Sequence, residues 1–149
     1  MQRSITYQTN IKHLFIFVFL LMYLSISSNM LMLPPLFGVA FIYFIKNFEN
    51  RFVLFFIFIY LLFFEALDDF ILFSSMLFFY ISYYLIYKNL SNIVVCYKCL
   101  IPILVAWSYI GFFIFSNILS YILNIDLFEF QLITIYFILI ESLLAIILF

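Results

Sequence analysis

Charged residues are scarce in this chain, and their scarcity bounds its class. Asp, Glu, Lys and Arg make up 9% of the 149 residues, whereas 70% are hydrophobic. A soluble domain carries roughly 25% charged residues, so the composition excludes one, and the low charge excludes a disordered chain. Repeated apolar runs of about 20 residues indicate transmembrane helices. The sequence therefore predicts an all-α, polytopic integral membrane protein in contact with membrane lipid.

Basic residues and histidine are also few. Six Lys and Arg residues stand against seven Asp and Glu, and no basic stripe is visible, so no nucleic-acid partner is expected. The one histidine, His13, lies beside Lys12 and is interpreted as an interfacial residue. A single histidine cannot supply the paired axial ligands of a haem-carrying membrane cytochrome, and a His-rich metal centre has no ligands.

Recognisable catalytic patterns are missing as well. The sequence contains no phosphate-binding loop, no nucleophile paired with a base, and no paired general acid and base. We therefore expect a non-enzymatic protein without a cofactor or a metal. Glycine occurs twice, against 24 Phe and 12 Tyr, which is typical of AT-rich coding. This bias favours a bacterial inner membrane or, alternatively, an organelle genome and the mitochondrial inner membrane.

Six apolar segments divide the chain, which we interpret as one transmembrane domain over residues 1–149. The polar start and the apolar run from Leu14 predict an uncleaved signal-anchor helix, because no small-residue cleavage site is clear. The six predicted helices span about 12–28, 33–49, 52–67, 70–87, 100–123 and 130–149.

The first two predicted helices have the least room. The 33 residues between Lys12 and Lys46 would reach roughly 50 Å as a helix, whereas two crossings need about 60 Å. The second helix is therefore expected to run past Lys46, with Pro34 and Pro35 in its first turn. One long span in place of the pair is the alternative.

The distribution of basic residues decides between these alternatives. With six spans and both termini cytoplasmic, all six basic residues lie on the cytoplasmic side, whereas merging the first pair leaves four against two. The positive-inside rule thus favours six helices. The basic residues are Arg3, Lys12, Lys46, Arg51, Lys88 and Lys98.

Three of the seven acidic residues fall within five positions, in the stretch FFEALDDFILFSS. Glu65, Asp68 and Asp69 are spaced so that a continuing helix would carry them on one face. A solvated outer turn, a partner contact and a divalent-cation site are the three interpretations. Because the third helix has to end here, the outer turn is favoured, and the three residues are candidates for contact with a partner.

Glu141 lies near the middle of the last predicted helix, where a carboxylate costs roughly 2.5–3.5 kcal/mol to insert. No Lys or Arg is expected at that depth, so its company should be Asn117, Ser116 or Ser108 of the fifth helix, or a partner subunit. A proton or cation site, an intersubunit hydrogen bond and a protonated carboxyl inside the bundle stay open. Glu141 and Asn117 are the predicted buried polar residues. Small residues along the fifth helix also predict a packing seam.

The string CYKC places two thiols, Cys96 and Cys99, before the fifth predicted helix on the cytoplasmic side. Two interfacial thiols are the favoured interpretation, because no second cysteine pair completes a zinc site and cytoplasmic thiols stay reduced. A redox pair with a lowered thiol pKa and half of a shared zinc site are the alternatives.

Residues 33–90 resemble MreD, the small polytopic subunit of the bacterial rod-shape (elongasome) machinery. The resemblance rests on a proline-led second helix, LPPLFGVAFIYFIKN, on a third helix with an acidic end, FIFIYLLFFEALDD, and on a short turn with small residues into a long fourth helix, FILFSSMLFFYISYYLIYKNL. The chain departs from the family in its third helix, which is rich in Phe and Ile where MreD proteins are rich in glycine, and in the turn, where Phe73 or Ser74 replaces glycine.

The resemblance implies a scaffold that binds MreC and supports the cell-wall synthase pair of RodA and penicillin-binding protein 2 in the inner membrane. MreD proteins also resemble the substrate-capture subunits of energy-coupling-factor transporters, which makes small-solute capture the first alternative. An accessory subunit of an organelle respiratory complex is the second.

Overall fold

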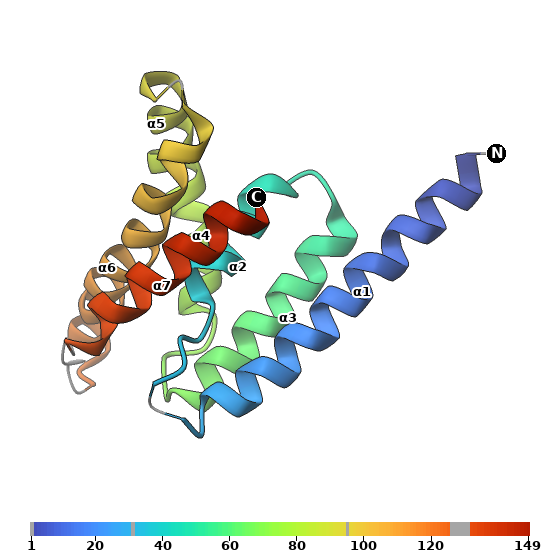
Figure 1. Cartoon of the computed structure of the whole chain (residues 1–149). Coiled ribbons are helices and arrows are strands. Elements are labelled where there is room, and N and C mark those ends of the chain that lie inside the picture. The colour runs from blue at the N-terminus through green and yellow to red at the C-terminus, as the bar shows by residue number, and fades with distance from the viewer. Residues whose placement is uncertain (1, 31, 95, 126–131) are drawn as a thin grey trace.

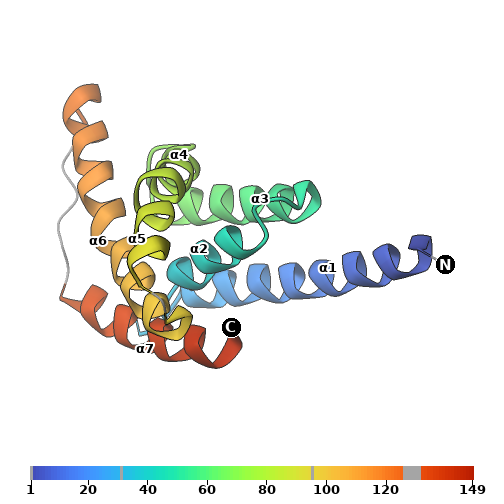
Figure 2. The ribbon, with the colours of Figure 1, turned by 90° about the horizontal axis from the view of Figure 1, so that it is seen from above.

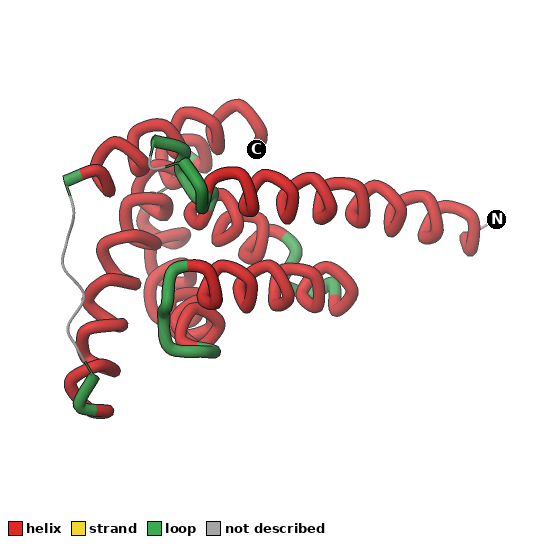
Figure 3. The backbone as a smooth tube through the Cα atoms, turned by 90° about the horizontal axis from the view of Figure 1, so that it is seen from below, coloured by secondary structure: helices red, strands yellow, loops and turns green. Residues whose placement is uncertain are grey.

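The computed structural model describes residues 2–30, 32–94, 96–125 and 132–149, and these are helical with short connecting loops (Figures 1 and 3). No strand occurs in the described residues, as the all-α prediction requires. The elements are α1 (Gln2–Ser27), α2 (Phe37–Lys46), α3 (Arg51–Leu67), α4 (Ser74–Ser82), η1 (Tyr83–Tyr87), α5 (Lys88–Ile93), α6 (Tyr97–Leu123) and α7 (Ile133–Leu148).

The π-helical segment η1 joins α4 to α5 without a break. Ser82 (φ −65°) and Lys88 (φ −62°), which flank η1, both have right-handed helical backbone angles. The three elements therefore form one continuous helix, and the described residues contain six successive helical segments. Their order agrees with the six apolar runs of the sequence.

Two groups of helices make up the structure. In one, α1 and α3 lie side by side, and the N-terminal part of α1 extends beyond the rest of the molecule (Figures 1 and 2). In the other, α2 packs against both α6 and α7, and α6 and α7 pack against each other. Contacts of α2 and α4 with α3 connect the two groups.

The short helix α2 lies at the centre of the core. Eight of its ten residues are buried, as expected for a helix that is apolar all round. The ring of Phe37 stacks on that of Phe64 at 4.9 Å and contacts those of Phe79 at 5.0 Å and Phe112 at 4.9 Å. Because these rings come from α3, α4 and α6, α2 holds the other helices together.

The length of α2 differs from the prediction. A helix over residues 33–49 was expected to pass Lys46, but α2 begins at Phe37 and ends at Lys46. Pro34 and Pro35 lie in the loop before the helix rather than in its first turn. A proline disfavours helical backbone angles in the residue before it, so Pro35 keeps Pro34 out of the helix. Ten residues measure about 15 Å, half the thickness of a bilayer core.

Length and composition identify one membrane-spanning candidate among the described helices, the segment Lys98–Leu123 of α6. Three other apolar helical segments are shorter, namely Phe15–Ser27, Phe37–Lys46 and Ile133–Leu148.

Candidate functional site: two buried carboxylates and a polar cavity

Glu141 lies on α7 with none of its surface exposed. Its Oε2 accepts hydrogen bonds from the backbone N–H groups of Gly38, at 2.7 Å, and Val39, at 3.2 Å. The hydroxyl of Tyr109 on α6 donates to its Oε1. The first N–H groups of a helix have no partner within the helix, and the helix dipole favours a negative group at that end. Glu141 therefore caps the N-terminus of α2.

The backbone before α2 is shaped for this carboxylate. Leu36 has left-handed backbone angles (φ 60°) and is followed by the right-handed residues of the helix. Such a change of hand turns successive N–H groups toward one point and forms an anion-binding nest. A Cβ atom on Gly38 would lie 2.8 Å from Glu141 Oε2 and 2.8 Å from Val105 Cγ1. One of the two glycines of the chain thus stands where the carboxylate approaches most closely.

The donors to Glu141 differ from those that the sequence suggested. The hydroxyl of Ser108 donates to the carbonyl of Val105 at 2.7 Å, and the buried hydroxyl of Ser116 has no hydrogen-bond partner among the described residues. Asn117 is half-buried on the same helix. The role of Tyr109 could not be predicted from the sequence, because nothing distinguishes it from the other tyrosines among the 12 in the chain. Gly38 carried a signal, because glycine is so rare here.

Glu65 on α3 forms a second cap of the same kind. It is 1% exposed, and its oxygens accept from the N–H groups of Phe73, at 2.7 Å, and Ser75, at 2.6 Å. The hydroxyls of Ser75, at 2.7 Å, and Ser74, at 3.2 Å, donate to its Oε1. Phe73 is left-handed (φ 69°), as Leu36 is before α2. Glu65 therefore caps the N-terminus of α4.

The structure corrects the role assigned to Glu65. The sequence placed its side chain in a solvated turn as a partner contact, whereas the carboxylate is buried and bonded to four groups of its own chain. Ser74 and Ser75, which follow it in FFEALDDFILFSS, were the available signal, because serine hydroxyls and helix-start amides are donors that suit a buried carboxylate.

Asp68 and Asp69 end α3 and are both exposed. The Asp68 N–H donates to the Phe64 carbonyl at 3.2 Å, and the Phe70 N–H donates to the Glu65 carbonyl at 3.0 Å. With Asp69 left-handed (φ 54°), this is the Schellman arrangement that closes helix C-termini. Partial burial, followed by the neighbouring charge of Asp69, raises the pKa of the Asp68 carboxyl. The helix ends before the three acids can share one face.

The described residues also contain no group of three or more His, Cys, Asp or Glu side chains placed to hold a metal ion. The carboxylate of Glu65 is already bonded to the start of α4. These contacts favour a turn over the divalent-cation site considered from the sequence.

A polar cavity of about 190 Å³ lies where the ends of α1, α3 and α7 meet the loop before α2. We call it the Asp68 cavity. Its wall includes Ser27, Ser28, Pro35, Asp68, Ile133 and Phe137.

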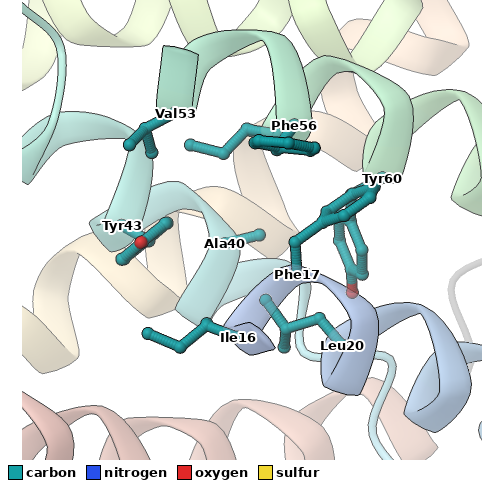
Figure 4. A pocket seen from close by; sticks show the side chains of 9 residues that line it. Ile16, Phe17, Leu20, Ala40, Tyr43, Val53, Phe56 and Tyr60 are labelled. Atoms are coloured by element: carbon teal, nitrogen blue, oxygen red, sulfur yellow. The ribbon is translucent and has the colours of Figure 1, made fainter. Parts of the chain in front are cut away.

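A second, apolar pocket separates α1, α2 and α3. Figure 4 shows side chains of the three helices facing a common space, among them Phe17, Ala40 and Tyr60. Its volume of about 20 Å³ is close to that of one water molecule. The Tyr60 hydroxyl donates to the Pro35 carbonyl, which fastens the loop before α2 to α3.

Cys96 and Cys99 are both exposed free thiols. Cys96 is the residue before α6, and its carbonyl accepts from the Cys99 N–H at 3.1 Å. The pKa of the Cys96 thiol is lowered, first by a hydrogen bond from the Cys99 thiol, then by the Cys99 backbone and by Lys98. The thiols are therefore adjacent and accessible, which both the interfacial and the redox interpretation require.

Comparisons with known proteins return no relative: no protein-family model, no curated protein and no solved structure matches the chain.

Proposed function

We propose that the chain is a six-helix integral membrane protein with both termini on the cytoplasmic side. Large apolar side chains are exposed on the helices, including Phe15 (70%), Phe19 (69%) and Ile147 (81%). A water-facing surface of this kind would drive aggregation, whereas lipid solvates it. The membrane-spanning candidate in α6 and the placement of the basic residues support the proposal.

In this arrangement α2 enters the membrane as a half-length helix behind a non-helical approach. Irregular backbone is tolerated at membrane depth only where protein covers it, and α2 is surrounded by α3, α6 and α7. Pro34 and Pro35 have no N–H donors to satisfy, and the Pro35 carbonyl accepts from Tyr60. Glu141 satisfies the first N–H groups of the helix. The approach is thus compatible with an apolar surrounding.

The role we propose is that of a non-enzymatic assembly subunit, resembling MreD of the elongasome. One observation carries it: the two buried carboxylates of the described residues both serve as helix caps, so they stabilise the framework of the bundle. The Glu65 cap also joins two of the three segments on which the resemblance rests, because the acidic end of the third helix binds the small residues that begin the fourth. The expected partners are MreC, RodA and penicillin-binding protein 2.

Affinity purification from the native membrane tests this role. We expect an MreC-type bitopic protein to co-purify, depletion of the chain to round rod-shaped cells, and the gene to lie beside those for MreB and MreC. A gene neighbourhood of respiratory or vitamin-uptake genes, together with purification free of an MreC-type protein, would contradict the proposal.

Small-solute capture is the second candidate, and the Asp68 cavity favours it. A capture subunit needs polar and aromatic groups that converge near the outer ends of its helices. The cavity lies at the C-terminal ends of α1 and α3 and at the N-terminal end of α7, which the proposed topology places on the outer side. Retention of a ligand through purification would support this candidate over the assembly role.

A further inference from the structure

The Asp68 cavity has the size of a small-molecule site. Its volume of about 190 Å³ exceeds that of an engineered cavity of about 150 Å³ that binds benzene. Four separate parts of the chain supply its wall, namely the end of α1, the loop before α2, the end of α3 and the start of α7. Its polar groups are therefore held by different elements and fixed relative to one another.

The polar groups of the wall are acceptors. The hydroxyl proton of Ser27 is used on the Leu24 carbonyl at 3.3 Å, and that of Ser28 on the Ser25 carbonyl at 3.1 Å. Both oxygens keep lone pairs for another donor. Pro35 has no N–H, and Asp68 carries a carboxylate. A molecule that fills this space has to bring the hydrogen-bond donors.

The electrostatics of the cavity favour a cation. No Lys, Arg or His is among the described residues of its wall. Helix C-termini carry partial negative charge, and two of them, at Ser27 and Leu67, meet here. The positive end of α7 lies at Ile133, and that of α2 is already capped by Glu141. The Asp68 carboxylate thus has no counter-charge among the described residues of the wall.

The wall discriminates between kinds of cation. A calcium site needs six to eight oxygen ligands, and Asp68 supplies the one carboxylate among the described residues of the wall, beside Leu, Met, Pro, Ile and Phe side chains. An organic ammonium ion matches both features, because its charge pairs with a carboxylate while its carbon atoms contact apolar walls. The aromatic ring of Phe137 adds a surface that ammonium groups favour.

We propose that the Asp68 cavity binds a small organic ammonium ion, with the carboxylate of Asp68 as its counter-ion. The proposal deepens the capture function by naming the class of solute. It rests on the proposed topology for the side from which the solute enters.

Calorimetry on the purified full chain in detergent tests the proposal with choline as the probe and its uncharged isostere, 3,3-dimethylbutan-1-ol, as the comparison. We expect saturable binding of choline and binding of the isostere that is weaker by about tenfold or more, the effect of losing one charged contact. Equal binding of the two probes, no binding of choline, or tighter binding of calcium ions than of choline would each overturn the proposal.

The neighbouring acids provide a matched pair of variants. Asp68→Asn should weaken choline binding about tenfold, whereas Asp69→Asn, which removes the same charge one residue outside the wall, should leave it within about twofold. Asn tolerates the left-handed backbone at residue 69. Equal loss in the two variants would mean a diffuse surface charge and would overturn the proposal.

A third variant changes α7 and leaves the turn at Asp68 and Asp69 intact. Phe137→Leu keeps an apolar wall and should weaken choline severalfold without affecting the isostere; an equal effect on both probes would count against an ammonium site. These readouts are independent of partner co-purification, so the site and the assembly role can fail separately. If cysteine-accessibility mapping placed the Asp68 turn on the cytoplasmic side, the topology would fail while choline binding still tested the site.

Discussion

The caps of α2 and α4 use the same design over very different chain distances. In each, a buried glutamate accepts from N–H groups at the start of a helix that a left-handed residue precedes. Glu65 reaches residues eight to ten positions ahead of it, whereas Glu141 reaches back 103 positions to Gly38. The first cap shapes one turn between neighbouring helices. The second links the last helix to the start of α2, and the comparison therefore separates local from tertiary control of a helix start.

Removal of the distant cap should have the largest effect. Glu141→Ala leaves two buried backbone donors and the Tyr109 hydroxyl without an acceptor, so we expect a loss of about 3 kcal/mol or more in the free energy of unfolding. Denaturant unfolding in detergent micelles measures it. Glu141→Gln, which keeps an acceptor, should lose markedly less. If the two variants were equally unstable, the acceptor would not be what matters.

Removal of the local cap should cost less. Phe73 is 51% exposed, so water can reach the turn at its N–H once the carboxylate is gone. The Ser75 N–H then remains as the one buried backbone donor of this cap without an acceptor. We expect Glu65→Ala to lower the free energy of unfolding by about 1–2 kcal/mol, measured in the same way. A loss as large as that of Glu141→Ala would remove the distinction between the two caps.

Steric crowding also tests the start of α2, where a glycine lies against the capping carboxylate. Gly38→Ala places a methyl group within 2.8 Å of Glu141 Oε2, so we expect a loss of about 1–3 kcal/mol. Gly111→Ala provides a control at the other glycine, where the close atoms belong to the rings of Trp107 and Phe78 and not to the cap. A combined Gly38→Ala, Glu141→Ala variant should be less unstable than the sum of its parts, because removing the carboxylate leaves Val105 Cγ1 as the one remaining contact of the methyl group at 2.8 Å.

The left-handed residues should respond to asparagine with opposite signs. Phe73 is half exposed and Leu36 is 9% exposed. Both have left-handed backbone angles, which cost free energy in Phe and Leu and which asparagine adopts more easily. Phe73→Asn should therefore raise the free energy of unfolding by about 0.5–1 kcal/mol, whereas Leu36→Asn should lower it by about 1 kcal/mol or more, because a polar group is buried. The same sign for both variants would show that burial does not distinguish the two sites.

Much of the fold follows from the sequence, because hydrophobic run length reports helices directly. The run over residues 100–123 predicts most of α6, and the end of α3 falls at Leu67 as predicted. The start of α2 could not be predicted, since it depends on a carboxylate 103 residues away. The sequence placed Glu65 in a solvated turn because a local stretch shows that a residue is charged but does not show which parts of the chain bury it.

The Glu141 cap has a consequence in time. At roughly 5–20 residues per second of synthesis, the 103 residues between Gly38 and Glu141 take about 5–20 s to produce. During that interval the start of α2 has no acceptor from α7, whereas the start of α4 finds Glu65 already made. The second helix of the chain therefore gains this cap only after the last one has been made, and a ribosome that stalls before α7 leaves the central helix without it.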